Sequence, residues 1–111
     1  MPRRPETILY DIRSAISDVE EFPRGRGRQD FMNDRMLQAA AERKLEIAGE
    51  AIRRLRSEFP EIAALISGCE KIAGFRNVLA HGYDVVSSEV VWDVVVNHLP
   101  ALKRDIEAIN L

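Results

Sequence analysis

Three side chains suited to acid–base and phosphate chemistry lie close together in the segment FRNVLAHGY, residues 75–83. Arg76 carries a permanent positive charge on a planar group that matches the geometry of phosphate oxygens. The imidazole of His81 titrates near neutral pH, so it donates or accepts a proton under physiological conditions. Tyr83 adds a hydroxyl two residues later. These residue types are compatible with acid–base chemistry beside a phosphate group.

The spacing of these residues requires the helix to end among them. In a regular helix Arg76 and Tyr83 share a face, whereas His81, five residues after the arginine, points about 140° away. Gly82 favours a helix end because glycine readily adopts the left-handed backbone conformation. We therefore expect a turn near His81 that brings the imidazole back toward the guanidinium.

Composition predicts one folded domain that spans residues 1–111. Apolar residues make up 46% of the chain and charged residues 31%, which is typical of a globular protein. The 16 basic and 18 acidic residues give a net charge of −2, which argues against nucleic-acid binding through bulk positive charge. Any contact with RNA would therefore be local.

The chain has one cysteine, Cys69, which excludes an intrachain disulfide and a cysteine zinc cluster. Neither His81 nor His98 has a carboxylate or thiol at a ligand-like spacing, so we expect no metal and no cofactor. The chain lacks an apolar stretch long enough to cross a membrane, and its N-terminus lacks the apolar core of a signal peptide. We expect a cytoplasmic protein that does not associate with membranes.

Hydrophobic periodicity predicts an all-α fold, an antiparallel bundle of four to five helices. The predicted helices cover about residues 5–22, 31–59, 60–68, 69–80 and 87–110, with a flexible basic connection at 23–28. The valines of the last segment favour a strand, but its apolar stripe keeps helical spacing for about five turns. We expect Pro100 to kink this helix near Asn97. Gly49, inside the long helix, predicts close approach of a neighbouring helix.

The segment RNVLAHGY resembles the R-x-x-x-x-H-x-Y signature of HEPN domains, in particular the small HepT-like toxins encoded beside a minimal nucleotidyltransferase. The resemblance extends beyond this signature. LYDIRSAISDVEEF is similar to the first helix of that family, LEIAGEAIRRL to its long central helix, and VVWDVVVNHLPALKRDIEAI to its closing helix. A lone arginine and histidine at this spacing would be a weak signal, and the wider similarity strengthens it.

This resemblance implies a homodimeric helical domain that acts as a metal-independent endoribonuclease. It implies that Arg76 and His81 are catalytic and that they face a cleft shared by two protomers. Asn77 and Tyr83 would position the substrate. The resemblance also implies a partner, a minimal nucleotidyltransferase antitoxin that neutralises the toxin by attaching AMP to Tyr83. RNA is the implied substrate.

Other interpretations of the same residues stay open. Arg76 could belong to a surface ion pair, His81 could satisfy carbonyls at a helix end, and Tyr83 could be a half-buried core residue. The same cleft could also belong to a non-catalytic subunit that binds a nucleotide, or that presents a substrate to a nucleotidyltransferase.

Several further residues have a structural interpretation that we favour. We expect His98 to be a hydrogen-bonded core or interface residue, Trp92 to lie in the core or a dimer interface, and Cys69 to be buried. The basic residues outside the signature are expected to form solvated faces, with steering of RNA as the alternative. These are Arg24, Arg26, Arg28, Arg53, Arg54 and Arg56. The acidic row Glu42, Glu46 and Glu50 is expected to pair with Arg53 or Arg54, with support of Arg76 as the alternative.

Overall fold

The computed structural model describes residues 4–21, 24–25, 27–67 and 88–109, and all regular structure within these ranges is helical. The elements in chain order are α1 (Pro5–Glu20), α2 (Arg28–Met32), α3 (Arg35–Glu58), α4 (Pro60–Ala63), α6 (Ser88–Asp93), the π-helical turn η1 (Val94–His98) and α7 (Leu99–Glu107). The prediction of an all-α helical bundle is confirmed.

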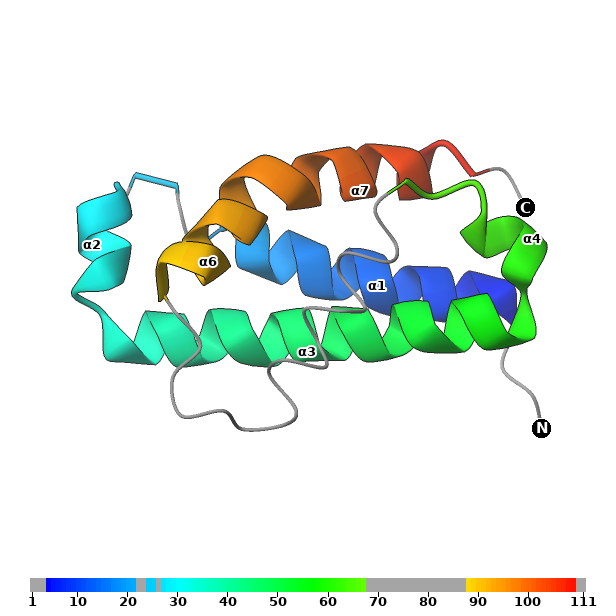
Figure 1. Ribbon diagram of the computed structural model, residues 1–111, viewed down its shortest axis with the longest axis horizontal. Helices are drawn as coiled ribbons and strands as arrows, with labels where there is room; N and C mark the ends of the chain where they lie inside the picture. Colours follow the sequence, from blue (N-terminus) through cyan, green and yellow to red (C-terminus); the bar gives the residue numbers. More distant parts are fainter. Residues whose placement is uncertain (1–3, 22–23, 26, 68–87, 110–111) are drawn as a thin grey trace.

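Three long elements lie lengthwise beside one another (Figure 1). Helix α1 runs antiparallel to α3 and packs most extensively against it, and α7 runs antiparallel to α1 and contacts it as well. The short helices α2 and α4 lie at opposite ends of α3. Lys103 of α7 also binds Glu20 of α1, with Nζ 2.8 Å from Oε2, which joins these two helices by an ion pair.

The apolar stripes predicted from periodicity form the core. From α1 and α3 the buried members are Ile8, Ile12, Ala15, Ile16, Val19, Ala41, Leu45, Ala48, Ile52 and Leu55. From the last segment they are Val91, Val95, Leu102 and Ile106. Gly49 is also buried within α3. No charged or polar side chain among the described residues is fully buried, so packing of apolar side chains is the main stabilising term.

The prediction of one uninterrupted helix over residues 31–59 is wrong at its N-terminal end. The chain forms the short helix α2, breaks at Asn33, and begins α3 at Arg35. The carboxylate of Asp34 accepts the backbone N–H of Leu37 at 3.0 Å, which satisfies one of the unpaired amides at the start of α3. The predicted connection at 23–28 is displaced toward the C-terminus, because α1 ends at Glu20 and α2 already begins at Arg28.

The segment after α3 is less regular than predicted. Pro60 occupies the first turn of α4, where its missing N–H costs nothing, but the helix ends at Ala63 instead of continuing to residue 68. Turns follow as far as Ser67, and within them the side chain of Ile66 is buried. The helix predicted over residues 69–80 lies outside the described residues.

The last helix is long, as predicted, and it is interrupted by a π turn near the predicted kink. Pro100 has no N–H to donate to the carbonyl four residues earlier, so a regular α-helix would lose a hydrogen bond here. The chain instead widens over Val94–His98, and the N–H of Leu99 bonds to the carbonyl of Val94, five residues back. A single wide turn therefore accommodates the proline.

Candidate functional site

The four predicted site residues, Arg76, Asn77, His81 and Tyr83, lie outside the described residues, and so does Cys69. Their predicted arrangement therefore stays a prediction. The structure does describe the elements on either side of this segment. The described part of the chain stops at Ser67 before this segment and resumes at Ser88 after it.

Ser67, the last described residue before this segment, is hydrogen-bonded to α7. Its backbone N–H donates to Oδ2 of Asp105 at 2.9 Å, and its hydroxyl donates to the same oxygen. These two hydrogen bonds hold the pKa of Asp105 below its usual range, because they stabilise the carboxylate. Hydrogen bonds to the ionised carboxylate of Asp105 thus attach the turn after α4 to α7.

The first described element after this segment is α6, which packs against α2. The guanidinium of Arg28 lies 3.0 Å from Oε1 of Glu89, and the rings of Phe31 and Trp92 are 5.4 Å apart at their centres. Trp92 packs against the hydrophobic core, which agrees with the structural interpretation of this residue. Helices α6 and α2 lie beside one another at one end of α3, and α4 lies at its other end (Figure 1).

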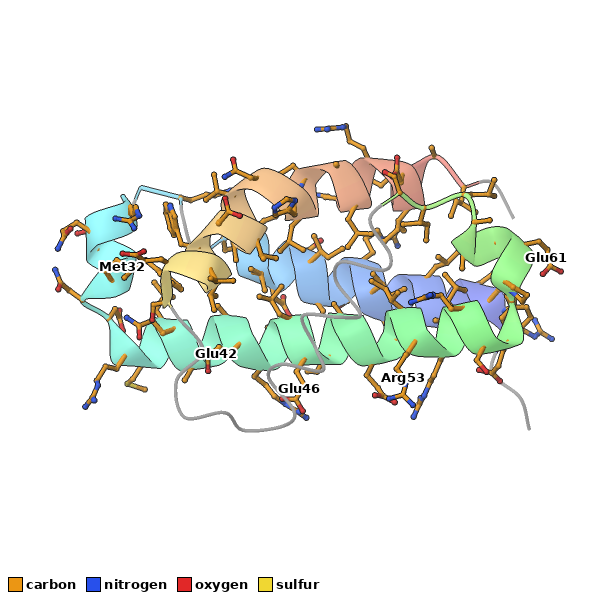
Figure 2. All side chains as sticks on the ribbon, in the orientation of Figure 1. Met32, Glu42, Glu46, Arg53 and Glu61 are labelled. Atoms are coloured by element: carbon orange, nitrogen blue, oxygen red, sulfur yellow. The ribbon has the colours of Figure 1, made fainter. Side chains whose placement is uncertain are left out.

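A row of glutamates runs along α3 (Figure 2). Glu50 pairs with Arg54 as predicted, with 3.9 Å between Oε1 and Nε. Glu46 pairs with Arg43 at 3.4 Å, so the expected partner Arg53 or Arg54 is wrong for this residue. Burial raises the pKa of Glu42, because an apolar environment disfavours the carboxylate.

Where the structure describes them, the arginines outside the signature either pair with a carboxylate or are exposed to solvent. Arg24 lies 3.4 Å from Glu21, and Arg28 pairs with Glu89. Arg53 and Arg56 are exposed on α3, and Arg26 lies outside the described residues. The interpretation of these residues as solvated faces is supported for Arg24 and Arg28, whose charges are already compensated.

A groove of about 550 Å³ runs between α1 and α3. Side chains of both signs line it, and Lys44 and Asp18 form an ion pair across it, with 2.7 Å between Nζ and Oδ2. Opposite charges that are paired in this way attract a polyanion weakly. The groove is therefore poorly suited to hold RNA by its phosphates.

His98 belongs to a small polar cluster created by the π turn. Its Nε2 lies 3.3 Å from one carboxylate oxygen of Asp93, and the amide of Asn97 donates to the other oxygen at 2.7 Å. The wider turn brings residues five apart onto the same face. His98 is half-buried and has a carboxylate partner in its own helix, so the prediction of a polar contact is confirmed, whereas the prediction of a place in the core is wrong.

The described parts of the chain contain neither a cluster of metal-ligating side chains nor a membrane-spanning helix. They contain no group of three or more His, Cys, Asp or Glu side chains placed to hold a metal ion. None of the described helices combines the length and apolar character that a membrane-spanning helix needs. These findings concern only the part of the chain that the structure describes.

Sequence reasoning missed an exposed aromatic residue on α1. The side chain of Tyr10 is 61% exposed, and the guanidinium carbon of Arg13 lies 6.0 Å from the centre of its ring. A groove of about 260 Å³ lies beside this pair, between α1 and the end of α7. The available signal was that Tyr10 falls off the apolar stripe of its helix.

The fold and the signature together define a class: a small all-α bundle that carries R-x-x-x-x-H-x-Y between two helices of the described structure. The sequence pattern of the family described as "Ribonuclease HepT-like" matches residues 12–109. The chain belongs to this HepT-like family.

The similarity to its relatives extends over nearly the whole chain. A Thermococcus cleftensis protein named a probable ribonuclease HepT is 36% identical over 110 residues, which cover 99% of each chain. A Methanocaldococcus jannaschii protein that is provisionally named an RNase is 33% identical over 107 residues, which cover 96% of this chain and 97% of the relative. A Caldanaerobacter subterraneus protein, also provisionally named an RNase, is 32% identical over 107 residues, covering 96% and 95%. No solved structure gives a significant match.

Proposed function

We propose that this protein is the cytoplasmic toxin of a toxin–antitoxin pair and that it cleaves RNA without a metal ion. The observation that carries the proposal is the family match over residues 12–109, which includes the intact signature. The names of the relatives as ribonucleases support the same activity. The chemistry of the signature side chains is consistent with it.

In the proposed reaction the 2′-hydroxyl of a ribose attacks the adjacent phosphorus. A base removes the hydroxyl proton, the bond from phosphorus to the 5′-oxygen breaks, and an acid protonates that oxygen. The products are a 2′,3′-cyclic phosphate and a 5′-hydroxyl. His81 is suited to the proton transfers, and Arg76 to stabilising the charge that develops on the phosphorane oxygens.

A homodimer would supply both the acid and the base. One imidazole carries out one proton transfer at a time, whereas the reaction needs two groups on opposite sides of the phosphorus. Two copies of His81 that face a shared cleft meet this requirement, each in a different protonation state. Asn77 would donate a hydrogen bond to phosphate or ribose, and Tyr83 would contribute its hydroxyl beside them.

The nature of the products tests this proposal. Single-stranded RNA is incubated with the purified protein in excess EDTA, and the ends of the fragments are analysed by mass spectrometry. We expect cyclic phosphate ends, and we expect RNA with 2′-O-methyl groups to resist cleavage because its nucleophile is blocked. Fragments with 5′-phosphate ends, or activity that EDTA abolishes, would contradict the mechanism. Nucleotide binding without cleavage of any RNA would support a non-catalytic subunit instead.

Tyr83 is the proposed site of neutralisation. A nucleotidyltransferase would join its phenolic oxygen to the α-phosphorus of ATP, and pyrophosphate would leave. The attached AMP is bulky and negatively charged, so beside Arg76 and His81 it would exclude an anionic substrate. After co-expression with the cognate nucleotidyltransferase, the intact mass should rise by whole AMP units, and Tyr83→Phe should prevent this rise. An unchanged mass of the parent protein would contradict the proposal.

A further inference from the structure

We infer that Tyr10 and Arg13 form a binding site for one nucleotide of single-stranded RNA, on the opposite flank of α1 from the groove shared with α3. This inference rests on the proposed function for the identity of the ligand, but its geometry comes from described residues. It would give the ribonuclease a substrate contact outside its signature segment.

The tyrosine ring provides a stacking surface. Tyr10 is one of the few large side chains with apolar surface that are exposed among the described residues, at 61%. The guanidinium carbon of Arg13, one helical turn later, lies 6.0 Å from the centre of the ring, at the outer limit of a cation–π contact. Nucleobases stack on exposed aromatic rings of this kind, largely without regard to sequence.

The groove beside the ring has a floor that suits the flat surface of a base or ribose. It measures about 260 Å³ and is lined by Glu6, Leu9, Tyr10, Arg13, Ile106 and Ile109. Leu9 and Ile106 are almost fully buried below it, and Ile109 is half-buried at its edge. An apolar floor with one aromatic ring and few polar groups is the common composition of a small-ligand site.

The charges of the groove orient an anionic ligand. Arg13 attracts phosphate, whereas Glu6 repels it, and both line the same groove. A nucleotide would therefore place its phosphate toward Arg13 and its base over Tyr10. In the groove between α1 and α3, by contrast, Lys44, Arg43 and Arg54 are already engaged in ion pairs with carboxylates.

Binding of a fluorescein-labelled 2′-O-methyl oligonucleotide, which the proposed reaction cannot cleave, tests the inference. By fluorescence anisotropy we expect Tyr10→Ala to weaken binding about tenfold and Tyr10→Phe to preserve it, because phenylalanine retains the stacking surface. We expect Arg13→Ala to lower the slope of log Kd against log salt concentration by about one and Tyr10→Ala to leave that slope unchanged. Glu6→Gln should tighten binding.

Controls separate this site from general effects. Met36→Ala removes another exposed apolar side chain, and Arg35→Ala removes another exposed arginine. Both residues lie at the N-terminal end of α3 and outside the groove, so neither substitution should change the affinity for the oligonucleotide. Circular dichroism should show that every variant is folded. Equal affinity of Tyr10→Ala and the parent would overturn the inference. So would a change in sedimentation coefficient on Tyr10→Ala, which would assign the groove to contacts between copies of the chain.

The proposed function and this inference fail differently. A parent protein that binds the oligonucleotide through Tyr10 but cleaves no RNA would contradict the ribonuclease proposal and leave the binding site intact. A parent protein that cleaves RNA with the same KM and kcat as Tyr10→Ala would contradict the binding site alone.

Discussion

Asp105 of α7 accepts two hydrogen bonds from Ser67, one from its backbone N–H and one from its hydroxyl. The two residues are 38 positions apart in sequence, and their contact fastens the turn after α4 to the last helix. Ser67 is also the last described residue before the segment that carries Arg76 and His81. The contact therefore anchors one end of the region on which the proposed chemistry depends.

Asp105→Asn should lower stability at neutral pH. The pKa of Asp105 is lower in the folded state than in the unfolded chain. The ionised carboxylate therefore stabilises the folded protein at pH values above its unfolded-state pKa, and this stabilisation disappears as the pH falls through its folded-state pKa. We expect a loss of no more than about 1 kcal/mol at pH 7, since the contact is exposed, and a smaller difference below about pH 4. Thermal unfolding of both proteins at pH 7 and pH 3 measures this.

Ser67→Ala is the control for that experiment, because it removes the hydroxyl donor and leaves the carboxylate. Its effect should combine with Asp105→Asn less than additively, since both changes disrupt one contact. Strict additivity, or a difference that persists unchanged at pH 3, would show that the contact does not act as described.

Glu42→Gln should have the opposite effect and raise the free energy of unfolding at pH 7. Burial raises the pKa of Glu42, so the charged form destabilises the folded protein above that value, and the penalty disappears once the carboxyl is protonated in both states. We expect the melting temperature to rise by roughly one or two degrees at pH 7 and to match the parent below about pH 4.

Glu46→Gln provides the matched comparison, because Glu46 lies one turn further along α3 and pairs with Arg43. It should not raise the melting temperature. A stabilisation as large as that of Glu42→Gln would indicate a general effect of reducing the negative charge of the glutamate row. A destabilised Glu42→Gln variant would contradict the assignment of burial as the dominant influence.

Asp34→Ala should destabilise the start of α3 by about 1 kcal/mol, because the N–H of Leu37 loses its acceptor. Urea unfolding followed by circular dichroism measures the change. Asn33→Ala, which alters the neighbouring exposed residue, should change stability by less than half as much. Equal effects of the two substitutions would mean that the carboxylate of Asp34 contributes little to the helix start.

The helical bundle could be predicted from sequence because its stripes are long and regular. Ile8, Ile12 and Ile16 recur every four residues and are all buried. The break between α2 and α3 was missed, since the stripe used for the prediction begins only at Leu37, after the break, and the capping carboxylate of Asp34 marks the start of α3. Periodicity reports which face is buried, but a local hydrogen bond decides where a helix begins.

Contacts between distant elements could not be predicted in the same way. Nothing in the sequence places Ser67 beside Asp105 or Arg28 beside Glu89, because both pairs depend on how helices cross. The π turn was partly predictable, since Pro100 requires some interruption but does not specify its form. The site residues themselves rest on the signature and on the family match.

The most direct test of the central claim is the single-turnover rate of RNA cleavage by the parent protein and by His81→Ala, in excess EDTA. We predict a rate at least about 100-fold lower for the variant, with an unchanged circular dichroism spectrum and melting temperature, because the proton transfers lose their imidazole. Cleavage by folded His81→Ala at the rate of the parent would contradict the assignment of His81 as the catalytic acid and base.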